Sequence, residues 1–152
     1  MALHIARVSN DFIRRIAQEY LLDFATMKRL ARTYKTSPST ISNILFKGVA
    51  ECILDDLTAE AVAAKAMSNT DNVVRTRKRW EKALELRKLP LFEEELAYEK
   101  KKLEELQFQL EHYEDYFLDD ACAPTERGLR CQVGRLKGDI RNLENYIANL
   151  KG

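Results

Sequence analysis

The segment TMKRLARTYKTSPSTISNILFK, residues 26–47, decides how the rest of this chain is organised. In its first half the apolar residues recur at spacings of three and four, which is the period of an α-helix. One face of that helix consists of Met27, Leu30, Ala31 and Tyr34. The segment is therefore predicted to begin with a short amphipathic helix.

A second helix is predicted to begin at Pro38. Ser37 can cap the free backbone amides there, and proline fits the first helical position because its missing N–H would have no partner. An apolar face of Ile41, Ile44 and Leu45 lies opposite the short polar residues Ser39, Thr40, Ser42 and Asn43. A helix that enters the major groove of DNA needs this combination of an apolar back and short hydrogen-bonding side chains.

The spacing between the two helices is typical of a helix-turn-helix motif. Ala31 supplies a small residue where the second helix crosses the first, and Ile41 closes the pair ten positions later. The turn departs from the usual pattern, because Lys35 stands where glycine commonly adopts a left-handed backbone, and Thr36 where an apolar residue is more common. An ordinary helical hairpin in an all-α core is the alternative.

The charge around this motif favours nucleic-acid binding. No Asp or Glu occurs from Phe24 to Ala50. A solvated helix surface normally mixes both signs, so a window of one sign indicates a surface that faces phosphates. The basic residues of this window are Lys28, Arg29, Arg32, Lys35 and Lys47.

Three segments resemble the DNA-binding domain of the sporulation stage III D family of transcriptional regulators. They are FIRRIAQEY at 12–20, the helix-turn-helix motif, and ILDDLTAEAV at 53–62. The resemblance covers roughly residues 9–80 and is most specific in SPSTI at 37–41. It implies a helical, DNA-binding N-terminal half and says nothing of the second half.

The composition is that of a soluble, helix-rich protein. The 152 residues are 45% hydrophobic and 32% charged, and only five Gly and three Pro disfavour a turn-rich β architecture. No apolar run reaches membrane-spanning length and the N-terminus lacks a signal-peptide layout, so a cytoplasmic protein without membrane contact is expected. The cysteines form no C-x-x-C pair and are expected to be reduced, without zinc: Cys52, Cys122 and Cys131.

The formal net charge of +1 conceals a basic first part and an acidic second part. Residues 1–90 contain 16 Lys and Arg against 10 Asp and Glu, whereas residues 91–152 contain 9 against 14. This asymmetry suggests that the first part meets nucleic acid and that the acidic part meets a protein partner.

The predicted fold is all-α, with a helix-turn-helix domain over residues 1–70, a basic connecting helix over 71–90 and an antiparallel coiled-coil hairpin over 91–152. Gly48 is expected to end the second helix of the motif, and the polar run at 68–72 to mark the domain boundary. The connecting helix carries the densest positive charge, which is either a second DNA contact or a solvated face: Arg75, Arg77, Lys78 and Arg79.

Apolar residues follow a heptad pattern on two helices of the last part, which are joined by a loop over 119–125. Pro90 is expected to kink or break the helix before them, and Gly134 and Gly138 to mark a close helix approach. Surplus aromatic residues suggest self-association into a dimer or a larger oligomer, with a monomeric hairpin as the alternative. The expected oligomerisation residues are Leu103, Leu106, Leu110, Leu136, Ile140, Leu143 and Ile147.

These features predict a sequence-specific, DNA-binding transcriptional regulator that needs no cofactor or metal and binds double-stranded DNA. Asn43 is suited to pair with adenine in the major groove. The expected DNA-binding residues are Lys28, Arg29, Ser37, Ser39, Thr40, Ser42, Asn43, Lys47, Arg75, Arg77, Lys78 and Arg79.

Three other classes of protein compete with this prediction. An enzyme is disfavoured, because the sequence has no phosphate-binding loop, nucleophile elbow or metal-ligand spacing, and His4 and His112 lie far apart. A DNA-binding assembly protein such as the small subunit of a phage terminase also joins a helix-turn-helix to a helical hairpin, but forms rings. A protein–protein adaptor would use the acidic hairpin alone.

Overall fold

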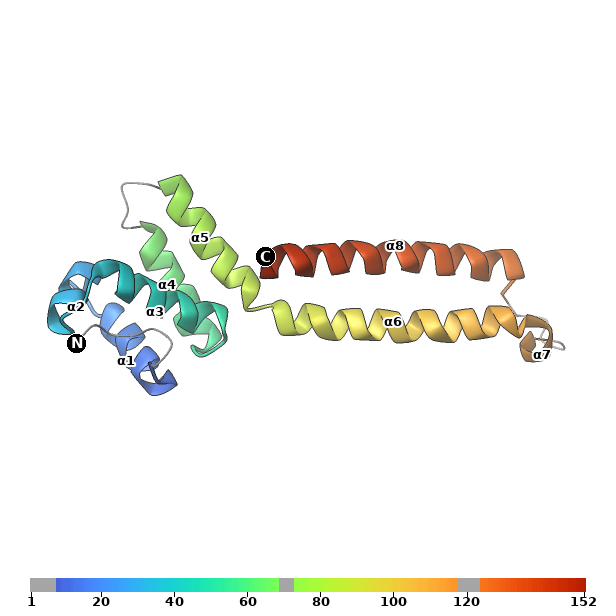
Figure 1. The fold of residues 1–152 in the computed structure, drawn as a ribbon, viewed down its shortest axis with the longest axis horizontal. Helices are drawn as coiled ribbons and strands as arrows, with labels where there is room; N and C mark the ends of the chain where they lie inside the picture. Colours follow the sequence, from blue (N-terminus) through green and yellow to red (C-terminus); the bar gives the residue numbers. More distant parts are fainter. Residues whose placement is uncertain (1–7, 69–72, 118–123) are drawn as a thin grey trace. The chain divides into compact units, whose positions relative to one another are not determined.

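The computed structural model describes residues 8–68, 73–117 and 124–152 (Figure 1). Every regular element in these ranges is an α-helix, as predicted. The chain divides into two compact units, Met1–Lys88 and Leu89–Gly152. The first contains α1 (Asn10–Tyr20), α2 (Met27–Thr33), α3 (Pro38–Ala50), α4 (Asp56–Ser68) and α5 (Val73–Leu86), and the second contains α6 (Leu89–Glu111), α7 (Tyr113–Phe117) and α8 (Glu126–Lys151).

Some sequence predictions fall outside the described ranges. They concern His4, Cys122, most of the polar run at 68–72 and most of the loop at 119–125. Within the described ranges, no helix is long and apolar enough to cross a membrane.

Buried apolar side chains from all five helices of the first unit meet in one core. The chain's single tryptophan, Trp80, comes from α5, is only 1% exposed and lies 6.0 Å from the ring of Phe46 on α3. The helix that the sequence suggested as a connecting segment is therefore packed into the first unit, against α3 and α4. The largest fully buried side chains of this core are Trp80, Ile13, Ile16, Ile41, Ile44, Leu45, Val49 and Val62.

Side-chain caps start three helices of the first unit, and the cap at Ser37 is the one that the sequence analysis predicts. The hydroxyl of Ser9 accepts the backbone N–H of Phe12 before α1, and that of Ser37 accepts the N–H of Thr40 before α3, both at 3.2 Å. Thr26 does the same for α2. Each cap satisfies an amide that has no partner within its helix, and each stabilises the helix by about 1 kcal/mol.

Gly48 does not end α3, and that prediction was wrong. The helix continues to Ala50, and Gly48 is buried within it. A Cβ added at Gly48 would lie 2.7 Å from Cγ2 of Ile13 and 3.1 Å from Cγ of Leu54. Glycine is present here because α1 packs too closely for any side chain, and local sequence does not distinguish that role from a helix end.

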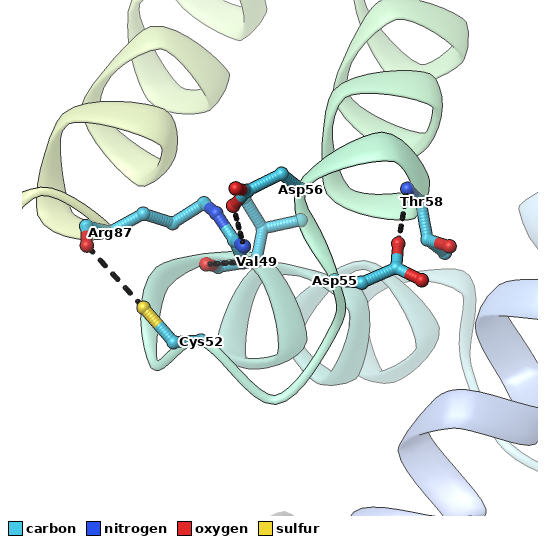
Figure 2. A network of polar contacts seen from close by, with 6 residues as sticks. All are labelled: Val49, Cys52, Asp55, Asp56, Thr58 and Arg87. Atoms are coloured by element: carbon cyan, nitrogen blue, oxygen red, sulfur yellow. Dashed lines mark hydrogen bonds and ion pairs between the residues drawn. The ribbon is translucent and has the colours of Figure 1, made fainter.

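Arg87 ties the end of α5 to two other segments of the first unit (Figure 2). Its Nη1 donates to the carbonyl oxygen of Val49 at 2.9 Å, and its Nη2 donates to Oδ1 of Asp56 at 2.6 Å. Beside this contact, Asp55 accepts the backbone N–H of Thr58 at 2.7 Å, and hydrogen bonding from Thr58 lowers the pKa of Asp55. These contacts hold the C-terminal end of α5 against α3 and α4.

In the second unit, α6 and α8 lie side by side and run in opposite directions (Figure 1). The ion pairs Lys100–Glu144, at 3.4 Å, and Lys151–Glu93, at 2.8 Å, link them. Pro90 is the second residue of α6, so the helix breaks before it, where a missing N–H is tolerated. Among the described residues of this unit, the buried ones all lie on α8: Leu129, Val133, Leu136, Ile140 and Ile147.

Gly134 and Gly138 do not mark a close helix approach, as the sequence had suggested. Both are exposed, and a Cβ added at either position would have no neighbouring atom within 4 Å. The prediction failed because the two glycines lie off the apolar stripe by which α8 meets α6. They weaken the helix without a compensating contact within this chain.

Candidate nucleic-acid interface

A tight turn sets the angle between α2 and α3. Lys35 has a φ of 53°, so it adopts the left-handed backbone that glycine commonly supplies at this position, although the sequence departs from the motif there. The N–H of Thr36 donates to the carbonyl oxygen of Ala31 at 2.8 Å, and the N–H of Lys35 donates to that of Arg32 at 3.3 Å. This is the Schellman arrangement, which glycine usually completes because a side chain at positive φ is strained.

The outward face of α3 carries short polar side chains. Ser39 and Asn43 are exposed and lie one helical turn apart. The hydroxyls of Ser37 and Thr40 are 2.9 Å from each other, so both belong to the capping structure at the start of the helix. Ser42 is half-buried. Ser39 and Asn43 are therefore the α3 residues best placed to reach a base edge.

Arg79 of α5 joins the basic cluster to this face of α3. Its Nη2 donates to Oδ1 of Asn43 at 2.6 Å, a charge-assisted hydrogen bond. The same guanidinium lies over the ring of Phe46, 5.0 Å from its centroid, and Phe46 in turn packs on Trp80. The sequence suggested the α3 face and the α5 cluster as two separate contacts, but Arg79 joins them, and we call the surface of Ser39, Asn43 and Arg79 the α3–α5 surface.

The other basic residues of the candidate interface are exposed. None of the ion pairs in the described part of the chain involves Lys28 or Arg29 of α2, or Arg75, Arg77 or Lys78 of α5. Their charges therefore remain available to an anionic partner, and attraction to phosphates supplies most of the affinity in non-specific DNA binding.

Lys47 differs from these residues. Its side chain is 28% exposed, and its Nζ lies 4.0 Å from a carboxylate oxygen of Glu51, one turn further along the chain. Such a long surface ion pair contributes little to stability, but the carboxylate lowers the local positive potential. Lys47 is therefore the least suited of the predicted basic residues to bind a phosphate.

Phe46 and Trp80 were missed as site residues, although they position Arg79. The available signal was the place of Phe46, three residues after Asn43 on a face that is otherwise polar. An aromatic ring on such a face requires a neighbour that covers it, and α5 supplies both an indole ring and a guanidinium.

The predicted oligomerisation residues pack between α6 and α8 of the same chain. Leu136, Ile140 and Ile147 are buried in the second unit. The remaining four are half-buried along the same pair of helices: Leu103, Leu106, Leu110 and Leu143. The exposed large apolar residues of this unit are instead Leu91, Tyr98, Phe108, Tyr116 and Tyr146.

The described residues offer little for metal chemistry. Among them, no group of three or more His, Cys, Asp or Glu side chains is arranged to hold a metal ion. The acidic run Glu93–Glu95 lies on solvated turns of α6, and Asp119 and Asp120 are outside the described ranges.

Comparison with known proteins gives no relative from which to transfer a function. No protein-family model, no curated protein and no solved structure matches this chain. The geometry and charge of the α3–α5 surface are therefore what bears on function.

Proposed function

We propose that this chain is a sequence-specific, DNA-binding transcriptional regulator in which α2 and α3 form a helix-turn-helix. The observation that carries the proposal is the α3–α5 surface, where exposed Ser39 and Asn43 adjoin Arg79, which has no acidic partner among the described residues. Short polar residues fit base edges, and Lys and Arg attract phosphates. The resemblance of residues 9–80 to the sporulation stage III D regulators supports the same function.

In this proposal each helix has a distinct part in binding. The N-terminal half of α3 enters the major groove, where its first turns approach the bases. Lys28 and Arg29, at the start of α2, contact the phosphates on one side of the groove. Arg75, Arg77 and Lys78 on α5 contact the phosphates near the N-terminal half of α3, because Arg79 of the same helix meets Asn43 there. These phosphate contacts fix the register in which Asn43 meets a base.

The test is selection of binding sites from a random pool of duplex DNA by the full-length chain. We expect one motif to be enriched, and we expect Asn43→Ala to weaken binding to that motif by about 1–3 kcal/mol while changing the affinity for random duplex little. Equal losses on both DNAs would show that α3 does not read bases. No enrichment would contradict sequence-specific binding.

The matched control removes positive charge from α5 and leaves the residues of α3 unchanged. Arg75→Ala combined with Arg77→Ala is suitable, because no hydrogen bond or ion pair in the described residues involves either side chain, whereas Arg79 contacts Asn43. This pair of substitutions should weaken binding to the enriched motif and to random duplex alike.

We propose further that the second unit, the α6–α8 hairpin, mediates self-association. Its exposed apolar side chains, among them Tyr98 and Phe108, offer a surface for a second copy of the chain. A dimer would place two α3 helices about 34 Å apart, one turn of the DNA duplex. Sedimentation with and without duplex DNA tests this, since a dimer that binds DNA supports a regulator.

The same measurement separates the alternative functions. A closed ring of many copies that binds DNA would favour a packaging protein of the terminase small-subunit type, which also combines DNA binding with a helical hairpin. If the chain binds no duplex DNA even at low salt, the remaining alternative is a protein–protein adaptor with the acidic hairpin as its interaction surface.

A further inference from the structure

The contact between Arg79 and Asn43 fixes which way the Asn43 amide faces. A guanidinium has only donors, so the group that it meets at 2.6 Å must be the amide oxygen, Oδ1. Arg79 is itself held by the ring of Phe46, 5.0 Å away, which packs on buried Trp80. The pair is therefore a positioned unit on the exposed α3–α5 surface.

This orientation changes what Asn43 offers to a base. Asparagine reads adenine by accepting from the N6 amino group through Oδ1 while its amide nitrogen donates to N7. Here the guanidinium already occupies one side of Oδ1, and an adenine amino group brought to that oxygen would point its hydrogens toward a cation. Arg79 uses one of the two lone pairs of Oδ1 and sets its positive charge beside the second, while the other polar groups of the pair, the amide N–H groups of Asn43 and the remaining N–H groups of Arg79, are all donors.

Guanine is the base that matches a surface made of donors. It presents two acceptors in the major groove, O6 and N7, whereas adenine presents one acceptor and one donor. Thymine offers a single acceptor beside its methyl group, and cytosine offers a donor. A pair in which donors outnumber the free acceptor thus favours guanine first, and it disfavours cytosine and, because of the cation beside Oδ1, adenine.

We infer that the Arg79–Asn43 pair selects a guanine in the DNA site, and that Arg79 is a specificity-determining residue although it lies on α5. The inference rests on the proposed function and names the base that the α3–α5 surface takes. It replaces the adenine contact that Asn43 alone would predict. Loss of Arg79 frees Oδ1, so the preference at that position then moves to adenine.

The experiment measures full-length protein on the enriched duplex by fluorescence anisotropy at one fixed salt concentration. Each guanine is first replaced in turn by 7-deazaguanine, which lacks the N7 acceptor, to find the contacted position. The four base pairs are then compared at that position. We expect guanine to be favoured over adenine by roughly 5- to 150-fold, the discrimination that one bidentate contact supplies.

Variants of the pair then test the role of each partner. Arg79→Ala should reverse the preference toward adenine, and Asn43→Asp, which keeps an acceptor for Arg79 but loses the amide donors, should reduce the guanine preference. Arg77→Ala is the matched control, because it removes an equal charge from the same helix and should lower affinity for all four base pairs by the same factor. Circular dichroism establishes that each variant is folded.

The outcomes separate this inference from the proposed function. Selection of adenine by the unmodified chain, insensitivity to every 7-deazaguanine, or an unchanged base preference in folded Arg79→Ala would overturn the inference and leave sequence-specific DNA binding in place. Absence of any duplex binding would overturn both. The 7-deazaguanine scan uses the unmodified protein, so the inference remains testable even if Arg79→Ala does not fold.

Discussion

The two units of this chain use apolar residues in opposite ways. In the first, five short helices cross one another and enclose side chains such as Ile13, Ile44 and Trp80 almost completely. In the second, two long helices meet along one line, so α8 buries a stripe while α6 has no fully buried residue. Crossing helices close a core, whereas a pair of helices leaves apolar surface for another partner.

The difference also bears on the role that we propose for each unit. A closed core holds α3 and α5 rigidly enough for Arg79 to meet Asn43, which a base-reading surface requires. The paired helices keep exposed aromatic residues instead, which suits them to contacts with a second copy. The comparison therefore predicts that substitutions in the first unit mainly change stability and DNA binding, and that surface substitutions in the second mainly change assembly.

The largest expected effect comes from Trp80→Ala. Truncation of a fully buried tryptophan should lower the free energy of unfolding of the first unit by about 3–5 kcal/mol, because it leaves a cavity between α3 and α5. Hydrogen exchange of the amides in each unit measures the change separately. The matched control is Val74→Ala on the same helix, where the side chain is exposed and the expected change is within about 0.5 kcal/mol. Equal effects of the two variants would mean that α5 does not belong to the core.

Alanine at glycine positions should act with opposite signs in the two units. Gly48→Ala places a methyl group 2.7 Å from Cγ2 of Ile13 and should destabilise the first unit by about 1–3 kcal/mol. Gly134→Ala meets no neighbouring atom and should stabilise the second unit by about 1 kcal/mol through helix propensity. Chemical denaturation measures both changes. If Gly134→Ala instead disrupts an oligomer without unfolding it, a second copy packs against that face of α8.

Lys35→Gly should produce a smaller, stabilising change in the first unit. The left-handed backbone at φ 53° is strained for lysine but not for glycine, so thermal unfolding should show a gain of about 0.5–1 kcal/mol. Lys35→Ala removes the same charge but keeps the strain, and should leave stability nearly unchanged. A loss of stability in the glycine variant relative to the alanine variant would argue against strain at this turn.

The smallest effect on stability is expected from Tyr98→Ser combined with Phe108→Ser. Both side chains are more than half exposed, so the folded hairpin should change by about 0.5 kcal/mol or less for each substitution. Sedimentation should nevertheless shift from oligomer toward monomer. Leu136→Asp is a poorer probe, because Leu136 is buried within its own chain and the substitution would unfold the hairpin. An oligomer that survives the serine variant places the interface elsewhere.

Local signals in the sequence were sufficient for much of the fold. The cap at Ser37 and the helix start at Pro38 depend on neighbouring residues only, and the structure contains both. The apolar period likewise identified the buried faces of α3 and α8. These features are governed by interactions within a few residues along the chain.

What the sequence did not reveal depends on contacts between distant segments. Gly48 was interpreted as a helix end because nothing local indicates that Ile13 packs against it. Arg79 and Asn43 are 36 residues apart, and helical period assigns each to a face without naming the partner of that face. The candidate site was therefore predicted as two separate contacts, and its junction became visible only in three dimensions.

We propose that α3 and α5 form a single DNA-binding surface. The most direct test of this proposal is the salt dependence of DNA binding by the full-length chain. The dissociation constant is measured on random duplex over a range of salt concentrations for the unmodified protein and for Arg75→Ala with Arg77→Ala. We expect the double variant to reduce the slope of log affinity against log salt concentration by about two units, roughly one for each lost phosphate contact. The control, Arg135→Ala with Lys137→Ala on α8, should leave the slope unchanged. An unaltered slope in the α5 variant would contradict a single DNA-binding surface of α3 and α5. It would show that the basic residues of α5 form a solvated helix face.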